Sequence, residues 1–249
     1  MADDTFQAQP PESQARAKTV VITGGGSGIG LALARVFARN GYSVVISGRD
    51  LQRLQASAYE LKQNSAAITA IPCDVRDAAA VQTMFQQIAQ QYSSLDVLIN
   101  NAGVAHAVSS VDTLPVETWK QVIDTNLTGT FLVTQAALPL LRPGSTIVNN
   151  LSVAATRPFP GMSAYNASKF GALGFTQALR EDLRKRGIRV LALLPGATNT
   201  DIWNQFWADA PKEKMVPADA VAQAVLHAVL APAGTTIEEI RIGPTGGAL

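Results

Sequence analysis

The fold is decided by one stretch near the amino terminus, Thr19-Val20-Val21-Ile22-Thr23-Gly24-Gly25-Gly26-Ser27-Gly28-Ile29-Gly30. Its β-branched start predicts a short buried strand, and residues 28–40, rich in Ala and Leu, predict a helix. The glycines between them allow a tight turn and let a pyrophosphate approach the backbone, while the helix start offers free N–H groups and a positive dipole end. A glycine run alone is equally compatible with a flexible turn. Its position between a strand and a helix favours a dinucleotide-binding site.

The rest of the chain repeats this alternation of strand and helix. The predicted strands are 19–22, 43–47, 67–72, 95–100, 145–150, 189–194 and 237–242, and the predicted helices are 28–40, 51–63, 78–92, 116–141, 163–186 and 218–230. Such alternation predicts βαβ units, and strands that are apolar throughout predict a sheet covered on both faces. We therefore expect an α/β, doubly wound fold with a seven-stranded parallel sheet flanked by helices on both faces. Residues 18–249 form one predicted domain, and residues 1–17 are predicted to be a disordered tail.

Composition excludes several classes of protein. The 249 residues carry a formal net charge of +1 and no long run of Lys or Arg, which disfavours nucleic acid or an anionic membrane as partner. No apolar run is long enough to span a bilayer, and the first residues lack the apolar run of a signal peptide. The single cysteine, Cys73, excludes an intrachain disulfide and a cysteine cluster for a metal. We expect a cytoplasmic protein without a bound metal.

Polar and small residues follow the predicted strands, at the edge of the sheet where ligands of such folds bind. After the second strand, Gly48 takes the place of an acidic residue that would hold a ribose 2′-OH, and Arg49 comes next. Arg49 favours NADP over NAD because an arginine accommodates the 2′-phosphate, although a surface charge before a helix would look the same. Asp74 could accept from an adenine amine or could cap the next turn. The other residues of this kind are Val75, Asn100, Asn101, Ala102, Gly103, Ser152 and the run 194–200.

Three further residues carry candidate chemistry. Asn126 falls inside a predicted helix, where Asn is unfavourable, and predicts either a local kink or a functional group. Tyr165 and Lys169 are four apart at the start of another predicted helix, so they share one face. A nearby cation lowers the pKa of a phenol and could adapt Tyr165 to work as a general acid or base. The pair by itself is weak, because a half-buried Tyr and a solvated Lys occur at this spacing by chance.

Taken together, these motifs resemble the short-chain dehydrogenase/reductase family, in its standard-length single-domain branch. The carrying residues, in the family's order, are the 23–30 glycine motif, 100–103, Asn126, Ser152, Tyr165, Lys169, Pro195 and Gly196. The resemblance extends from about residue 18 to the end of the chain and implies a Rossmann fold. It also implies an enzyme that transfers hydride between a cofactor and a ketone or secondary alcohol, the cofactor being NADP(H) rather than NAD(H). One departure concerns the cofactor, since Ser27 stands where some NADP-preferring members carry a basic residue.

The resemblance also implies a role for each catalytic residue. Tyr165 is expected to be the general acid in reduction and the general base in oxidation. Lys169 is expected to lower the pKa of Tyr165 and to hold the nicotinamide ribose. Ser152 is expected to orient the substrate oxygen, and Asn126 to hold a water that links Lys169 to bulk solvent.

The implied cofactor site and the pocket draw on residues from the whole length of the chain. The cofactor residues are Gly24, Gly26, Ser27, Gly28, Ile29, Gly30, Arg49, Asp74, Val75, Asn101, Ala102, Gly103, Tyr165, Lys169, Pro195, Gly196, Thr198 and Thr200. The pocket residues are Ser152, Ala154, Phe159, Tyr165, Trp203, Phe206 and Trp207. Because aromatic side chains are costly to expose, the last three predict an apolar or aromatic substrate, a closed hydrophobic lid or contacts between subunits.

Alternatives remain at this stage. A non-catalytic, redox-sensing regulator could use the same dinucleotide site, but such proteins on this fold usually lose the Tyr or the Lys, and both are present. A serine hydrolase is disfavoured because Gly-x-Ser-x-Gly is absent. His106 could face the pocket mouth, although a surface position is favoured. Family resemblance implies a homotetramer or homodimer that pairs helices 116–141 and 163–186. Neither the physiological substrate nor the direction of reaction follows from the sequence.

Overall fold

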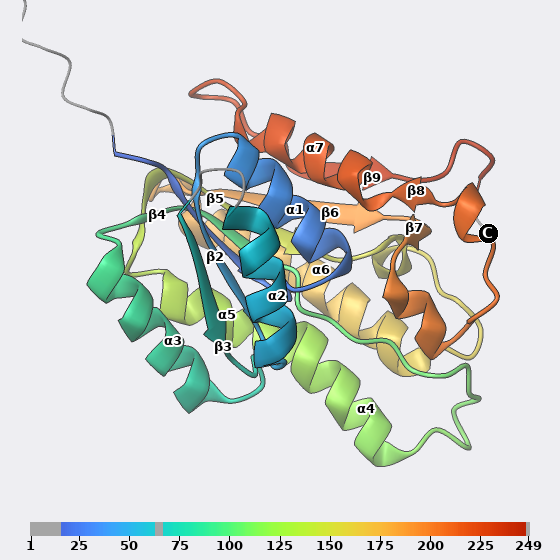
Figure 1. Ribbon diagram of the computed structural model, residues 1–249. Helices are drawn as coiled ribbons and strands as arrows, with labels where there is room; N and C mark the ends of the chain where they lie inside the picture. Colours follow the sequence, from blue (N-terminus) through green and yellow to red (C-terminus); the bar gives the residue numbers. More distant parts are fainter. Residues whose placement is uncertain (1–15, 63–66, 248–249) are drawn as a thin grey trace, which may run out of the picture.

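The predicted parallel sheet forms the centre of the molecule. The computed structural model describes residues 16–62 and 67–247. Seven parallel strands lie in the order β3-β2-β1-β4-β5-β6-β9 (Figure 1). Their bounds are β1 Thr19–Thr23, β2 Ser43–Gly48, β3 Ile68–Pro72, β4 Leu95–Asn100, β5 Leu141–Asn150, β6 Arg189–Pro195 and β9 Glu239–Ile242. The predicted fold class is therefore confirmed, and residues 1–15 of the predicted tail lie outside the described part of the chain.

Helices cover both faces of the sheet. One layer is formed by α1 Gly28–Arg39, α2 Leu51–Lys62 and α7 Ala218–Val229, and the other by α3 Ala78–Gln91, α4 Val116–Ile123, α5 Gly129–Ala137 and α6 Ser163–Arg184. In β1, Val20 and Ile22 pack into the first layer, whereas Val21 packs into the second. Since successive strand residues point to opposite faces, this is why the strand sequence is apolar throughout.

The strand order places a crevice in the middle of the sheet. β1 lies between β2 and β4, so the chain runs outward from β1 in both directions and the order reverses there. The connections on the two sides of such a switch point cover opposite faces, and the loops after the strands separate. Ligands of this architecture bind in the resulting crevice, beyond the carboxyl ends of the strands.

The prediction of one long helix over residues 116–141 is wrong in the middle of that range and at its end. The helical path has a π-helical segment, Asp124–Thr128, and α5 ends at Ala137. Pro139 cannot continue a helix, since it has no N–H and its ring clashes with the preceding turn. Leu141, expected to be helical, begins β5 instead.

A small pair of strands was not predicted. β7 Thr198–Asn199 pairs with β8 Val216–Pro217, and the residues between them include the 3₁₀ segment Asp201–Gln205. The pair is too short to leave an alternating pattern in the sequence. Across the described residues, no helix is long and apolar enough to cross a membrane.

Candidate active site

The glycine turn between β1 and α1 forms one end of the site. Gly24 and Gly28 have φ of 64° and 52°, a region that L side chains rarely adopt. A Cβ on Gly30 would lie 2.1 Å from the carbonyl oxygen of Gly24, so a side chain there would displace the backbone. The side chain of Ser27, at the start of α1, makes no capping hydrogen bond. The helix start therefore keeps N–H groups available for an anion, and the turn fits the pyrophosphate of a dinucleotide.

A polar network fixes the loop after β4 beside this turn. Thr23 Oγ1 accepts hydrogen bonds from the backbone N–H groups of Asn101 and Ala102, both at 3.0 Å. Asn101 Nδ2 donates to the carbonyl oxygens of Thr23 and Gly24 at 3.0 and 3.1 Å. Asn150 Nδ2, at the end of β5, donates to Asn101 Oδ1 at 2.8 Å. The carboxyl ends of β1, β4 and β5 are thus joined by side-chain hydrogen bonds.

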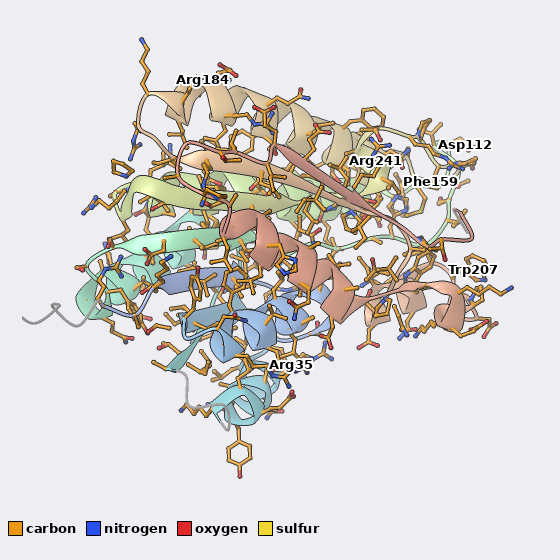
Figure 2. The ribbon with its side chains drawn as sticks, turned by 90° about the horizontal axis from the view of Figure 1, so that it is seen from above. Arg35, Asp112, Phe159, Arg184, Trp207 and Arg241 are labelled. Atoms are coloured by element: carbon orange, nitrogen blue, oxygen red, sulfur yellow. The ribbon has the colours of Figure 1, made fainter. Side chains whose placement is uncertain are left out.

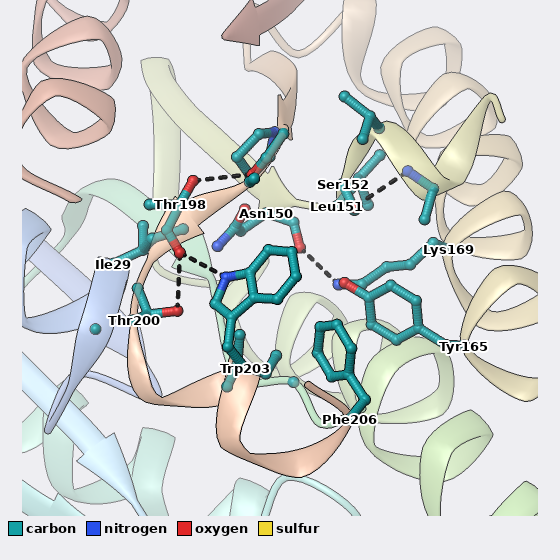
Figure 3. Close-up of a pocket in the computed structure, with 18 of the residues that line it drawn as sticks. Ile29, Asn150, Leu151, Ser152, Tyr165, Lys169, Thr198, Thr200, Trp203 and Phe206 are labelled. Atoms are coloured by element: carbon teal, nitrogen blue, oxygen red, sulfur yellow. Dashed lines mark hydrogen bonds between the residues drawn. The ribbon is translucent and has the colours of Figure 1, made fainter. Parts of the chain in front are cut away.

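Tyr165, Lys169 and Ser152 lie together on one wall of a cleft (Figure 3). The Lys169 ammonium donates to the carbonyl oxygen of Asn150 at 3.1 Å and lies 5.6 Å from the centre of the Tyr165 ring. Ser152 Oγ accepts from the backbone N–H of Ala154 at 3.0 Å. The helix brings Tyr165 and Lys169 to one face, as their spacing predicts, and β5 delivers Ser152 to the same place.

The pKa values differ from the sequence expectation. Burial raises the pKa of Tyr165 above its usual value, and a hydrogen bond with Ser152 offsets part of that rise. Burial lowers the pKa of Lys169 to about 8. The lowering of the Tyr165 pKa by Lys169 that we expected is not found: burial raises this pKa, and the contribution that opposes the rise comes from Ser152. Tyr165 is consequently protonated at neutral pH, as a proton donor must be, and Lys169 still carries its charge there.

Asn126 lies at a local irregularity of the helix, one of the two alternatives that its position in the sequence predicts. It is 2% exposed and sits in the π-helical segment between α4 and α5, an irregularity that is frequent at functional sites. Its Oδ1 accepts from the N–H of Val104 at 2.8 Å, and its Nδ2 donates to Val104 O at 2.9 Å and to Ser168 Oγ at 3.0 Å. Asn126 is behind the cleft rather than in its lining, and it joins the loop after β4 to α6. Its expected contact with a water stays a prediction.

The cleft has a volume of about 810 Å³, and aromatic side chains line its outer end, away from the glycine turn. Trp203 Nε1 donates to the carbonyl oxygen of Thr198 at 2.8 Å, which fixes the indole over the cleft (Figure 3). The rings of Trp203 and Phe206 are 4.8 Å apart, and Trp207 is 6.0 Å from Trp203 but 44% exposed. Every residue predicted for the substrate pocket lines this cleft: Ser152, Ala154, Phe159, Tyr165, Trp203, Phe206 and Trp207.

Most of the predicted cofactor residues line the same cleft, and five do not. Those in the lining are Gly24, Ser27, Gly28, Ile29, Asn101, Ala102, Gly103, Tyr165, Lys169, Pro195, Gly196, Thr198 and Thr200. Gly26 and Gly30 belong to the turn but not to its inner surface. Arg49, Asp74 and Val75 are also outside the lining. The Asp74 carboxylate is paired with Arg76 at 2.6 Å, which lowers the pKa of Asp74 below its usual value.

Sequence reasoning missed several lining residues and misplaced one histidine. Arg53 is in the cleft and lies in the first turn of α2, four residues after Arg49, which was the available signal for it. Arg157 and Arg241 also line the cleft, and no local motif marks Arg241. His106 is 5% exposed and is absent from the cleft lining, so both the pocket-mouth and the surface positions were wrong. Its Nδ1 lies 2.8 Å from the carbonyl oxygen of Ala107.

Comparison with known proteins agrees with this geometry. Residues 18–211 match the short chain dehydrogenase family model. The chain belongs to the short-chain dehydrogenase family. It is thereby an oxidoreductase that acts on alcohol and carbonyl groups. Sulfoacetaldehyde reductase 2 of Chromohalobacter salexigens is 37% identical to this short-chain dehydrogenase, over 91% of the chain and 94% of the relative.

Solved structures of the family have the same fold as this short-chain dehydrogenase. An alcohol dehydrogenase from the archaeon Thermococcus sibiricus, complexed with 5-hydroxy-NADP, superposes with a TM-score of 0.87 at 27% identity, over 94% of this chain and 99% of that one. A short chain dehydrogenase from Burkholderia cenocepacia in complex with NADP gives a TM-score of 0.83 at 34% identity, over 92% and 98%.

Proposed function

We propose that this protein is an NADP(H)-dependent carbonyl reductase and alcohol dehydrogenase in which Tyr165 is the general acid and base. One observation carries the proposal. A single cleft is lined both by the glycine turn, which fits a pyrophosphate, and by Tyr165, Lys169 and Ser152. A cofactor held by its pyrophosphate at the turn would therefore extend towards the hydroxyl and ammonium groups on α6.

The chain's own residues supply a proton, an orientation and a charge. When bound, the nicotinamide supplies or accepts the hydride. The Ser152 hydroxyl donates to the substrate carbonyl oxygen and orients it beside Tyr165. The Tyr165 hydroxyl, protonated at neutral pH, donates its proton to that oxygen as the carbonyl is reduced. The Lys169 ammonium, held by Asn150, stabilises the phenolate that is left and holds the ribose.

NADP(H) is favoured over NAD(H) by the charges near the end of β2. Positions 48 and 49 are Gly and Arg, so no carboxylate is present where an acidic residue would hold a ribose 2′-OH. Arg49 follows the strand directly, and Arg53, in the first turn of α2, lines the cleft. The two cofactor complexes described above, both with NADP or its derivative, support the binding of NADP(H).

The aromatic end of the cleft supports an apolar or aromatic substrate body. The rings of Trp203 and Phe206, tilted by 40° to one another, form an aromatic wall that a ring or an alkyl chain would contact. A homo-oligomer is proposed as well, since Trp119, Phe131 and Phe170 are 40–45% exposed on α4, α5 and α6.

The test follows NADPH and NADH absorbance with a panel of aryl ketones, β-ketoesters and aldehydes, using wild type, Tyr165→Phe and Tyr59→Phe. Tyr59 is 73% exposed on α2 and serves as the matched control. We expect oxidation of NADPH to exceed that of NADH, and Tyr165→Phe to lower kcat by about 10²–10⁴-fold while NADPH still binds. Tyr59→Phe should behave as wild type.

Each alternative outcome has a distinct meaning. Wild-type turnover by Tyr165→Phe would refute the role of the phenol. A preference for NADH would refute the assignment of NADP(H) and leave the enzyme class intact. Tight dinucleotide binding without turnover of any carbonyl would favour the non-catalytic regulator.

A further inference from the structure

Two arginines mark the outer end of the cleft, away from the glycine turn. Arg157 lies in the loop between Ser152 and Tyr165, and Arg241 lies on β9. Arg241 Nη2 donates to Thr156 Oγ1 at 3.1 Å, which places β9 beside that loop. Figure 2 shows Arg241 and Phe159 at the same end of the molecule, and Phe159, Arg157 and Arg241 all line the cleft.

The cleft is far more cationic than the chain as a whole. The complete sequence holds 20 Lys and Arg against 19 Asp and Glu. The residues that line the cleft include four cations, Arg53, Arg157, Lys169 and Arg241, and one anion, Asp201. Arg53 belongs to the cofactor end and Lys169 to the catalytic group. Arg157 and Arg241 belong neither to the glycine turn nor to the Tyr165, Lys169 and Ser152 group, so they add a surplus of positive charge beyond those two parts of the cleft.

No carboxylate neutralises this surplus within the described residues. Neither Arg157 nor Arg241 forms an ion pair there, whereas Arg35, Arg76, Arg180 and Arg184 all do. The guanidinium of Arg157 lies 5.4 Å from the centre of the Phe159 ring, a cation–π contact that restricts its orientation. Within the described residues, the Arg241 side chain donates a hydrogen bond only to Thr156, so most of its N–H groups remain free. Arginine has the planar fork that suits carboxylate, sulfonate and phosphate oxygens.

We infer that the substrate carries, besides its carbonyl, an anionic group of this kind that Arg157 and Arg241 bind at the outer end of the cleft. The inference rests on the proposed function for the reaction itself. In this arrangement the aromatic wall contacts the body of the substrate, the two arginines hold its charged end, and Ser152 and Tyr165 receive its carbonyl. The arginines select the substrate and take no part in proton transfer.

The test uses pairs of carbonyl compounds that differ only in charge. Benzoylformate is compared with its methyl ester, and succinic semialdehyde with methyl 4-oxobutanoate. The α-ester is the more electrophilic ketone of the first pair, so a preference for the acid must come from binding. The measured quantity is the ratio of kcat/KM for acid over ester in wild type, Arg157→Gln, Arg241→Gln and the control Arg39→Gln. Arg39 is an exposed cation at the end of α1, outside the cleft.

Wild type should prefer the acids, and either cleft variant should lower the ratio by about tenfold, as expected for losing one charge-assisted hydrogen bond. Arg39→Gln should keep the wild-type ratio. Added salt should lower the ratio as well, since these exposed charges are screened. An acid-to-ester ratio that neither cleft variant changes would overturn the inference and leave the reductase standing.

A binding measurement decides the question even if no carbonyl of the panel is reduced. Two of the three tryptophans, Trp203 and Trp207, line the cleft, so tryptophan fluorescence reports its occupation. With saturating NADP⁺, benzoate should quench this fluorescence and benzamide should not, and each cleft variant should weaken benzoate binding about tenfold. Equal binding of benzoate and benzamide, or benzoate binding unchanged in both variants, would refute the anion site independently of turnover.

Discussion

Replacing Asn126 by Ala removes a side chain that joins the loop after β4 to α6. Asn126 is 2% exposed and makes three hydrogen bonds of 2.8–3.0 Å, two to the backbone of Val104 and one to Ser168 Oγ. Ser168 keeps its own donation to the carbonyl oxygen of Tyr165 at 2.7 Å, so it is not left without a partner. In the variant, the backbone N–H and C=O of Val104 lose their hydrogen-bond partner, the Asn126 side-chain amide.

The expected loss of stability follows from these contacts. A hydrogen bond contributes about 1 kcal/mol net, and a buried group left unpaired costs about 1–3 kcal/mol. The two Val104 groups are part-buried and the bond to Ser168 is buried, so the three lost bonds together give about 3–4 kcal/mol. Ala has a higher helix propensity than Asn, which offsets about 0.5 kcal/mol. We therefore expect Asn126→Ala to lower the free energy of unfolding by about 3 kcal/mol.

Urea denaturation followed by circular dichroism measures this change as a lower midpoint at unchanged slope. The matched control is Asn204→Ala, because Asn204 is exposed and accepts one hydrogen bond, from Lys212. We expect the control to stay within about 0.5 kcal/mol of wild type. A loss below about 1 kcal/mol in Asn126→Ala would refute the reasoning, because the three bonds would then be replaceable by water.

Two further predictions concern the glycine turn and the buried lysine. Gly30→Ala should abolish dinucleotide binding in a fluorescence titration, since its Cβ would lie 2.1 Å from Gly24 O. Gly174→Ala on α6, whose Cβ meets nothing within 4 Å, should bind the dinucleotide normally. Normal binding by both variants would contradict the steric argument. Burial lowers the pKa of Lys169 to about 8 from 10.5, so between these values the unfolded chain binds more protons and folding is favoured as pH rises. Relative to Lys169→Met, the free energy of unfolding of wild type should increase by up to about 1.4 kcal/mol per pH unit from pH 8 to 10 in urea titrations; a flat difference would show that the ammonium is solvated.

The sheet and its covering layers follow from local sequence pattern. Apolar runs such as Val20 to Ile22 indicate strands buried on both faces, as in a parallel sheet. Apart from the helix predicted over 116–141, the helices between the strands start and end close to where periodicity places them. Pairs such as Tyr165 and Lys169 are brought together by helix geometry alone. The glycine turn follows from the same local patterns, whereas the candidate catalytic hydroxyls and the aromatic wall were assigned by residue number from the family resemblance.

Other features depended on contacts between distant parts of the chain. The raised pKa of Tyr165 is an effect of burial, which spacing along a helix does not encode, and it overrides the expected influence of Lys169. Asn126, in the π-helical segment, is bonded to Val104 and Ser168, 22 and 42 positions away. Arg241 meets Thr156 across 85 positions because β9 lies beside β6 in the sheet. The sequence by itself determined the fold, since it arises from repeating local patterns, and it identified the candidate reacting groups through their resemblance to a family. Only the tertiary structure decided the protonation of those groups and the charge at the outer end of the cleft, since both depend on which distant residues exclude water or bring charge there.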